Sequence, residues 1–304
     1  MKGTVIFSIC TVPFFIYNTF MEIVRASVLG FCFGVRRAVE LAEKALIDNP
    51  GKNVYSLGPL IHNETALKAL GEKGLKIVEE NQLELIPDES VVIIRAHGVP
   101  LSVINELKKK NAKIIEATCP RVKASQKMVG KYNKADELVI LTGDKNHGEV
   151  KGIAGYAGSN FVLIETVDDA EKLVINDENM KVVLLSQTTF SPKQFVEIEN
   201  ILKNKIKNLT VYNTICPATN ERQEALLELC KEVDGVLVIG GKSSSNTIRL
   251  YQTAAANCGK AAHIQGVEDI PEEFFKLKKV GITAGASTPD GIIDAVTAAL
   301  NKRS

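Results

Sequence analysis

Three cysteines, Cys32, Cys119 and Cys216, divide the chain into thirds of nearly equal length, with intervals of 87 and 97 residues. Each cysteine follows a short apolar run of strand character and precedes a stretch with helical periodicity. A cysteine in this position lies at a helix N-terminus, where free backbone N–H groups and the helix dipole favour a thiolate or another bound anion. The spacing therefore predicts three equivalent strand-to-helix turns, each carrying one thiol.

Two further polar residues follow each cysteine at similar distances. The nearer set lies 28 to 30 residues after the cysteines and consists of His62, His147 and Ser244. The farther set lies 65 to 71 residues after them and consists of His97, Thr188 and Ser287. Most of these residues closely follow an apolar run, as expected of side chains at the carboxyl ends of parallel strands. Nine aligned positions predict a threefold internal repeat.

The repeat predicts an α/β protein of three units related by a pseudo-threefold axis, each a mostly parallel four-stranded sheet with flanking helices. We expect the first unit over residues 33–118, the second over 119–212 and the third over 213–304. The third unit is one strand short, and residues 21–32, with the strand predicted over Glu22–Val28, would complete it. This closure would bring the three thiols together at the centre.

Composition argues against two classes of partner. Lys and Arg total 37 against 36 Asp and Glu, so the net charge is +1. Nucleic acids and membrane surfaces normally bind proteins with a basic excess, so we expect neither as a partner. Six irregularly spaced cysteines in 304 residues do not resemble a secreted disulfide framework, and we expect a cytoplasmic protein. Cys230 and Cys258 are predicted to be packing residues.

Residues 1–20 differ from the rest of the chain. They carry an apolar run from Val5 to Phe20 that Pro13 and Asn18 interrupt. A weak signal peptide or anchor is one interpretation, but the run is short for a membrane span and no small-residue cleavage site follows. We favour an upstream start codon, with Met21 as the natural first residue, and assign this extension no role.

Three converging thiols without a fourth partner at matching spacing predict a metal site with one open position. Zinc held by three cysteines and water is possible, but structural zinc usually draws ligands from close pairs such as C-x2-C, which this chain lacks. An iron–sulfur cluster held from three directions fits the symmetry better. The iron without a protein ligand would then be left for substrate.

The polar residues predict what surrounds such an iron. Imidazoles, hydroxyls and an amide beside helix starts are suited to phosphate oxygens, and they come from His62, His97, Ser244, Ser245 and Asn246. Glu149 lies two residues after His147. It is either the favourable acid of a first helical turn or a proton donor to a leaving hydroxyl.

These motifs resemble those of the LytB family, the 4-hydroxy-3-methylbut-2-enyl diphosphate reductases, from about Met21 to the C-terminus. The matching segments are Gly30–Val35, His62–Asn63, Ala96–Val99, Ala117–Pro120, His147–Val150, Gln187–Thr189, Ile215–Thr219, Ser244–Asn246 and Thr283–Ser287. The resemblance implies the last step of the methylerythritol phosphate pathway, in which two electrons and two protons remove the substrate hydroxyl as water. The products would be isopentenyl and dimethylallyl diphosphates.

The resemblance also implies roles for individual residues. Cys32, Cys119 and Cys216 would ligate a [4Fe-4S] cluster, and Glu149 would donate the proton with help from Thr188 and His147. Substrate would be bound by His62, His97, His147, Thr188, Ser244, Ser245, Asn246 and Ser287. The chain carries no flavin or nicotinamide fingerprint, so electrons would come from an external donor of the ferredoxin or flavodoxin type.

Three alternatives stay open at this point. Quinolinate synthase is similar in having three α/β units around a three-cysteine cluster, although the motifs at Ser244–Asn246 and His147–Glu149 argue against it. A non-catalytic iron–sulfur carrier or sensor would normally ligate all four irons with protein. A cluster-free phosphate-binding protein would survive the loss of its cysteines.

Overall fold

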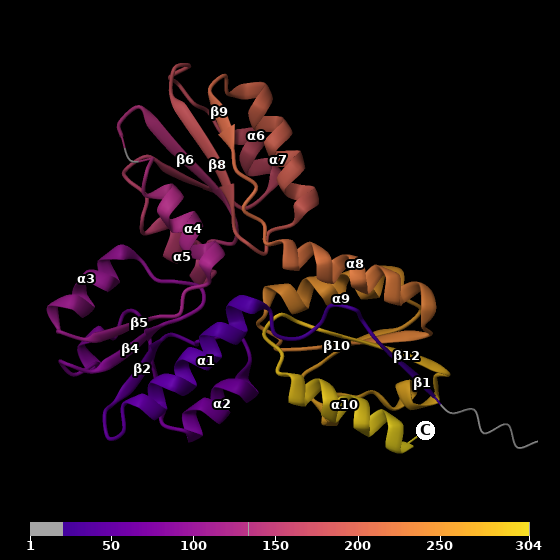
Figure 1. The fold of residues 1–304 in the computed structure, drawn as a ribbon. Coiled ribbons are helices and arrows are strands. Elements are labelled where there is room, and N and C mark those ends of the chain that lie inside the picture. Colours follow the sequence, from indigo (N-terminus) through magenta and orange to yellow (C-terminus); the bar gives the residue numbers. More distant parts are fainter. Residues whose placement is uncertain (1–20, 133, 304) are drawn as a thin grey trace, which may run out of the picture.

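A computed structural model describes residues 21–132 and 134–303 (Figure 1). Three lobes surround a common centre, and the N-terminal segment crosses from the third lobe to the first. The expectations for residues 1–20 lie outside the described residues. Within the described residues, the strands form three separate four-stranded sheets, and every pair of neighbouring strands is parallel. The predicted α/β class is confirmed, while the exact unit boundaries stay a prediction.

The first two sheets have equivalent strand orders. In the first, the order is β3 (Leu75–Val78), β2 (Val54–Leu57), β4 (Val91–Ile94) and β5 (Lys113–Glu116). In the second, it is β7 (Phe161–Ile164), β6 (Glu137–Thr142), β8 (Lys181–Ser186) and β9 (Leu209–Val211).

The third sheet repeats this arrangement with a strand from the start of the chain. Its order is β11 (Ala261–Ile264), β10 (Gly235–Ile239), β12 (Lys279–Ala284) and β1 (Glu22–Arg25). Glu22 pairs with Lys279 and Arg25 with Ile282. The strand ends earlier than the predicted run, yet Gly30 N–H still donates to the Ala284 carbonyl at 3.4 Å. The segment that leads to Cys32 therefore stays beside β12 after the regular strand has ended.

Helices connect the strands. Those of the first sheet are α1 (Phe33–Asp48), α2 (Glu64–Glu72) and α3 (Leu101–Lys109). Those of the second are α4 (Pro120–Val129), α5 (Gly148–Ala154), α6 (Val167–Lys172) and α7 (Pro192–Lys205). Those of the third are α8 (Pro217–Glu232), α9 (Ser245–Asn257) and α10 (Asp290–Arg303). None of these is long and apolar enough to span a membrane.

Each sheet is covered on both faces, which explains its continuous apolar strands. In β4, Val91 and Ile93 pack into one buried cluster, whereas Val92 and Ile94 pack into another. In β10, Val236 and Leu237 likewise pack into two different buried clusters. Because successive side chains of a strand point to opposite faces, each lobe has two apolar layers around one sheet. The lobes are thus stable frames whose strand ends can hold polar groups.

The prediction that Cys230 and Cys258 are packing residues is confirmed, but it missed that the two residues are bonded to each other. They form a disulfide that joins the C-terminal end of α8 to the residue after α9. Both cysteines border the same apolar cluster, and their Cα atoms are 5.1 Å apart. The two helices pack side by side, so two residues chosen separately as core positions lie within bonding distance.

Candidate active site

The three predicted thiols have the same local setting. Cys32, Cys119 and Cys216 are the N-cap residues of α1, α4 and α8. The backbone N–H of each donates to a carbonyl oxygen beyond the end of a neighbouring strand, and the acceptors are Ala286 (3.0 Å), Ala96 (2.9 Å) and Thr188 (2.8 Å). Each turn is therefore fixed between an edge strand and the strand beside it. The repeat seen in the sequence is present in the backbone hydrogen bonds.

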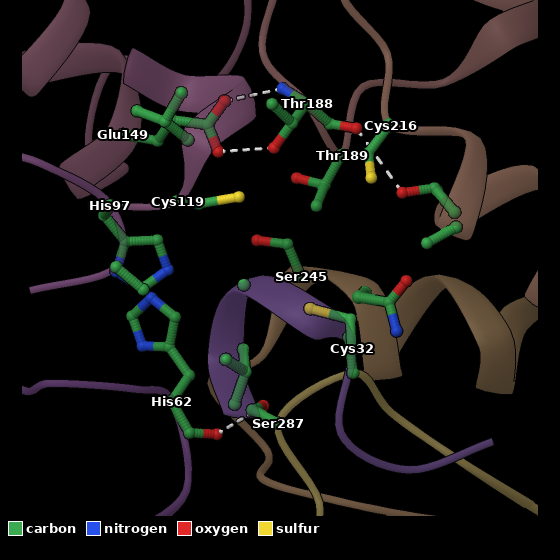
Figure 2. Close-up of a pocket in the computed structure, with 18 of the residues that line it drawn as sticks. Cys32, His62, His97, Cys119, Glu149, Thr188, Thr189, Cys216, Ser245 and Ser287 are labelled. Carbon is green, nitrogen blue, oxygen red and sulfur yellow. Dashed lines mark hydrogen bonds between the residues drawn. The ribbon is translucent and has the colours of Figure 1, made fainter. Parts of the chain in front are cut away.

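The three side chains, here called the thiol set, point toward one another at the centre of the molecule (Figure 2). All three are free and half-buried, and none forms a capping hydrogen bond. Burial raises the pKa of Cys119 and Cys216, although helix N–H groups act in the opposite direction. Burial thus outweighs the helix N-terminus, which was expected to favour thiolates. A bound metal centre would have to displace these protons.

Gly34 makes the approach of two lobes possible. It lies in the first turn of α1, and a Cβ at this position would be 2.6 Å from the Cys119 sulfur. A side chain here would force either the helix or the thiol to move. The missing side chain therefore lets the helix start of the first lobe contact the cysteine of the second.

Three of the four histidines in the chain meet beside the thiols. The ring centroids of His62 and His97 are 4.5 Å apart, and those of His97 and His147 are 5.2 Å apart. One ligand nitrogen from each ring can be chosen so that all lie within 4.8 Å of one another. The trio could therefore bind an oxyanion through N–H groups, or hold a metal ion.

The imidazoles are neutral near pH 7. Burial is the largest cause that lowers the pKa of each, and that of His147 falls to about 4. His147 Nδ1 accepts a hydrogen bond of 3.2 Å from the Glu149 N–H as the cap of α5. The ring proton of neutral His147 is therefore on Nε2. The buried Nε2 of His62 has no hydrogen-bond partner among the described residues.

Arg95 is a buried cation behind the imidazoles that sequence reasoning did not assign to the site. It is 8% exposed and forms an ion pair with Glu80. Its charge contributes to the lowered pKa of all three histidines. A Cβ on Gly148 would lie 2.8 Å from its guanidinium, so glycine leaves room for it. Its position in the sequence, directly after β4 and beside Ala96 and His97, could have identified Arg95 as a residue of the site.

Glu149 is the acid of the site. Its side chain is 2% exposed, and its two carboxylate oxygens accept hydrogen bonds from the Thr188 N–H (2.6 Å) and hydroxyl (2.7 Å). Burial raises its pKa to about 6, and the two bonds from Thr188 oppose that shift. An acid with a pKa close to the working pH can give up and regain a proton, which is what general acid catalysis requires.

The third lobe contributes hydroxyls and an amide at the start of α9. Ser244 caps the helix by accepting from the Thr247 N–H at 3.4 Å, and the Asn246 side-chain nitrogen is buried without a partner among the described residues. Ser287 donates to the His62 carbonyl at 3.1 Å and so joins the third lobe to the first. A helix start with free N–H groups and unpaired donors is suited to a phosphate group.

A single cavity brings all of the predicted site residues together. We call the members other than the cysteines the polar set: His62, His97, His147, Glu149, Thr188, Ser244, Ser245, Asn246 and Ser287. The lining also includes residues that were not predicted, among them Arg121, Thr189, Thr219 and Arg222. Arg222 could have been identified because it is the charged residue on the buried side of α8, where the following buried residues are Ala225 and Leu226.

Comparison with known proteins gives consistent results. Residues 23–301 match the family model described as LytB protein. The 4-hydroxy-3-methylbut-2-enyl diphosphate reductase of Treponema denticola is 44% identical over 91% of this chain and 98% of its own. That of Caldanaerobacter subterraneus is 42% identical over 91% and 95%. The solved E-1-hydroxy-2-methyl-but-2-enyl-4-diphosphate reductase of Plasmodium falciparum is 31% identical, with a TM-score of 0.85 over 91% of this chain and 87% of that one.

Proposed function

This chain belongs to the LytB protein family, and from that premise we propose that it reduces 4-hydroxy-3-methylbut-2-enyl diphosphate in the non-mevalonate route to isoprenoids. Two electrons and two protons convert the allylic alcohol to isopentenyl or dimethylallyl diphosphate, and the hydroxyl leaves as water. The observation that carries the proposal is a buried acid, Glu149, in one cavity with three thiols and a group of hydrogen-bond donors suited to phosphate oxygens.

The thiol set fits an iron–sulfur cluster. Cys32, Cys119 and Cys216 are free, lack capping hydrogen bonds and converge from three helix starts. We assign them a [4Fe-4S] cluster, in which three protein thiolates leave one iron without a protein ligand. When bound, the cluster supplies electrons and a Lewis-acidic iron. The residues of the polar set bind, orient and protonate the substrate.

The diphosphate is held by the imidazoles and by the start of α9. The unpaired nitrogens of His62 and Asn246 and the hydroxyls of Ser245 and Ser287 are donors that phosphate oxygens accept. A metal ion on the three imidazoles would use ring nitrogens but not the amide N–H of Asn246. The donor chemistry of the whole set therefore favours an oxyanion over a metal ion at this position.

Glu149 and Thr188 deliver the proton. The protonated carboxyl has one O–H group, and the Thr188 hydroxyl is 2.7 Å away and can both accept and donate a hydrogen bond. The acid therefore gives its proton to the departing substrate oxygen either directly or through this hydroxyl. The Thr188 N–H, at 2.6 Å, holds the other carboxylate oxygen and orients the group.

The electrons come from a separate carrier of the ferredoxin or flavodoxin type, because the chain lacks a nicotinamide or flavin fingerprint. We place the protein in the cytoplasm, where such carriers operate. The alternatives of a quinolinate synthase-like enzyme, a carrier or a cluster-free binding protein receive no support from the family match.

The test is anaerobic turnover with reduced methyl viologen as electron source. Wild-type protein is first reconstituted, and its iron, sulfide and visible absorbance are measured. We expect loaded protein to consume the substrate and form both products, as measured by chromatography. If protein with a full cluster leaves the substrate unchanged, the proposed reaction is wrong.

A further inference from the structure

We propose that Arg222 is a positioning residue of the thiol set, which joins the segments carrying Cys32 and Cys216 and holds a positive charge that raises the reduction potential of a bound cluster. The inference rests on the proposed function, since it requires a cluster on the three thiols. The hydrogen bonds of Arg222 go to the Ala218 and Gly30 carbonyls and not to Glu149, Thr188 or His147, so its effect is expected in the cofactor and not in the chemistry of Glu149.

Arg222 is a buried arginine with neutral hydrogen-bond partners. It lies on α8, six residues after Cys216, and is 3% exposed. One guanidinium nitrogen donates to the Ala218 carbonyl at 2.9 Å, and another donates to the Gly30 carbonyl at 2.8 Å. In the described parts of the chain it forms no ion pair with a carboxylate.

The contact with Gly30 explains how the residue positions a thiol. Gly30 stands two residues before Cys32, in a turn with a φ of +75° that favours glycine. The hydrogen bond from Arg222 joins this turn to α8 across 192 positions of sequence. A single planar guanidinium therefore connects two of the three cysteine-bearing segments, and the fork geometry of arginine makes both contacts possible.

No carboxylate of the described residues pairs with the positive charge of Arg222. Removing a cation from water is costly unless an opposite charge or hydrogen bonds compensate it. The ionisable groups that attract its charge are Cys32, Cys216 and Glu221, and Glu221 is exposed to solvent. Thiolates that hold a cluster would supply the buried negative charge that this site otherwise lacks.

The Nε–H group supports the same assignment. It is buried and has no hydrogen-bond partner among the described residues, although the other two nitrogens are bonded. A buried donor without a partner usually marks a ligand or an ordered water. Positive charge and N–H donors near the sulfurs favour the reduced cluster, because reduction adds negative charge, and they raise its potential.

The experiment compares Arg222→Met, Arg222→Gln and Arg222→Lys with Arg121→Met. Arg121 also lines the cavity, two residues after Cys119, and its charge acts on Cys216 as well. It is exposed, however, so solvent and salt screen its charge. Each protein is reconstituted anaerobically. Iron and sulfide are counted, and the cluster potential is measured by a redox titration followed by electron paramagnetic resonance.

We expect the neutral Arg222 variants to retain fewer clusters and those clusters to titrate at a more negative potential. Arg222→Lys should keep a potential near that of wild type but retain fewer clusters, because it keeps the charge and loses the fork. Arg121→Met should shift the potential less than Arg222→Met. If only Arg222→Lys takes up a cluster, this supports the conclusion that cluster binding requires a positive charge at this position.

Two results would overturn the inference. The first is a wild-type potential in loaded Arg222→Met, or a shift no larger than that of Arg121→Met. The second is wild-type iron and sulfide content in all three Arg222 variants, which would show that the guanidinium does not position the segments that carry Cys32 and Cys216. A wild-type protein that binds no iron would instead refute the proposed function itself.

Discussion

The thiol set and the polar set line the same cavity but differ in symmetry. Each cysteine follows an edge strand, occupies the N-cap position of a helix and donates its backbone N–H to the extension of the neighbouring strand. The polar set occupies repeated positions too, yet the first lobe supplies two imidazoles there, the second an imidazole and the Thr188 hydroxyl, and the third two serine hydroxyls. Only the second lobe adds a buried carboxyl to the cavity lining. Three cysteines in the same backbone setting suit a cofactor that is held from three directions. Different side chains at the equivalent positions of the three lobes can orient a substrate whose two ends differ.

Removing one cysteine of the thiol set should have the largest effect on cluster binding and turnover. We expect Cys119→Ser to hold no stable cluster and to lose turnover completely, because a serine hydroxyl does not replace a thiolate as a ligand of iron. Iron and sulfide analysis with the viologen assay measures both effects. Cys230→Ser is the control, since it removes a sulfur outside the cavity and should keep the cluster while lowering thermal stability. Full activity of Cys119→Ser would contradict the assignment.

Changing the acid of the polar set should leave the thiol set intact. Glu149→Gln keeps the shape of the side chain but cannot supply the proton, so we expect turnover to fall by about 10²–10⁴ with unchanged iron content. Glu137→Gln is the matched control, because Glu137 is also a buried glutamate but lies in β6, outside the cavity lining. A Glu149→Gln variant as active as this control would show that the carboxyl is only a favourable acid of the first turn of α5.

The raised pKa of Glu149 predicts the pH dependence of the reaction. Only the protonated acid can donate, so the rate should fall roughly tenfold per pH unit above a pKa of about 6. The contribution of Glu149 to folding stability also falls as the pH rises, because its folded pKa lies above the value of 4.5 taken for a free glutamate. The contribution is present below about pH 4.5 and is lost as the pH rises through about 6.

The Glu149→Gln variant provides the check on this pH profile. Its residual rate should lack the fall near pH 6, whereas the wild type should show it. Stopped-flow reduction of substrate across pH 5 to 8, with cluster absorbance recorded at each pH, separates loss of the acid from loss of the cofactor. Profiles that coincide would mean that another group is the acid.

The approach of Gly34 to Cys119 provides the mildest test. Gly34→Ala places a methyl group 2.6 Å from the Cys119 sulfur, and overpacking of this kind costs about 1–3 kcal/mol. Gly71→Ala is the matched helical control, because a Cβ there meets nothing within 4 Å, and it should add about 0.5–1 kcal/mol. Denaturant unfolding and iron content measure the two effects. Equal stability of both variants would show that the thiol and helix move apart easily.

Much of the architecture could be predicted because its signals are local. The strand-to-helix turns at Cys32, Cys119 and Cys216 follow from periodicity, and each cysteine lies at a helix N-terminus as predicted. The common spacing of polar residues then indicated that these turns face one centre. All of the predicted site residues line one cavity because the carboxyl ends of parallel strands meet at the same edge of each sheet.

The sequence by itself therefore determined the repeat, the three sheets and the residues available to the site. Only the tertiary structure decided how those residues behave. It raised the pKa of Cys119 and Cys216, joined Cys230 to Cys258, and placed Arg222 against the turn before Cys32. Burial, bonding distance and charge compensation depend on which atoms from distant segments become neighbours, and the spacing of residues along the chain does not contain those distances.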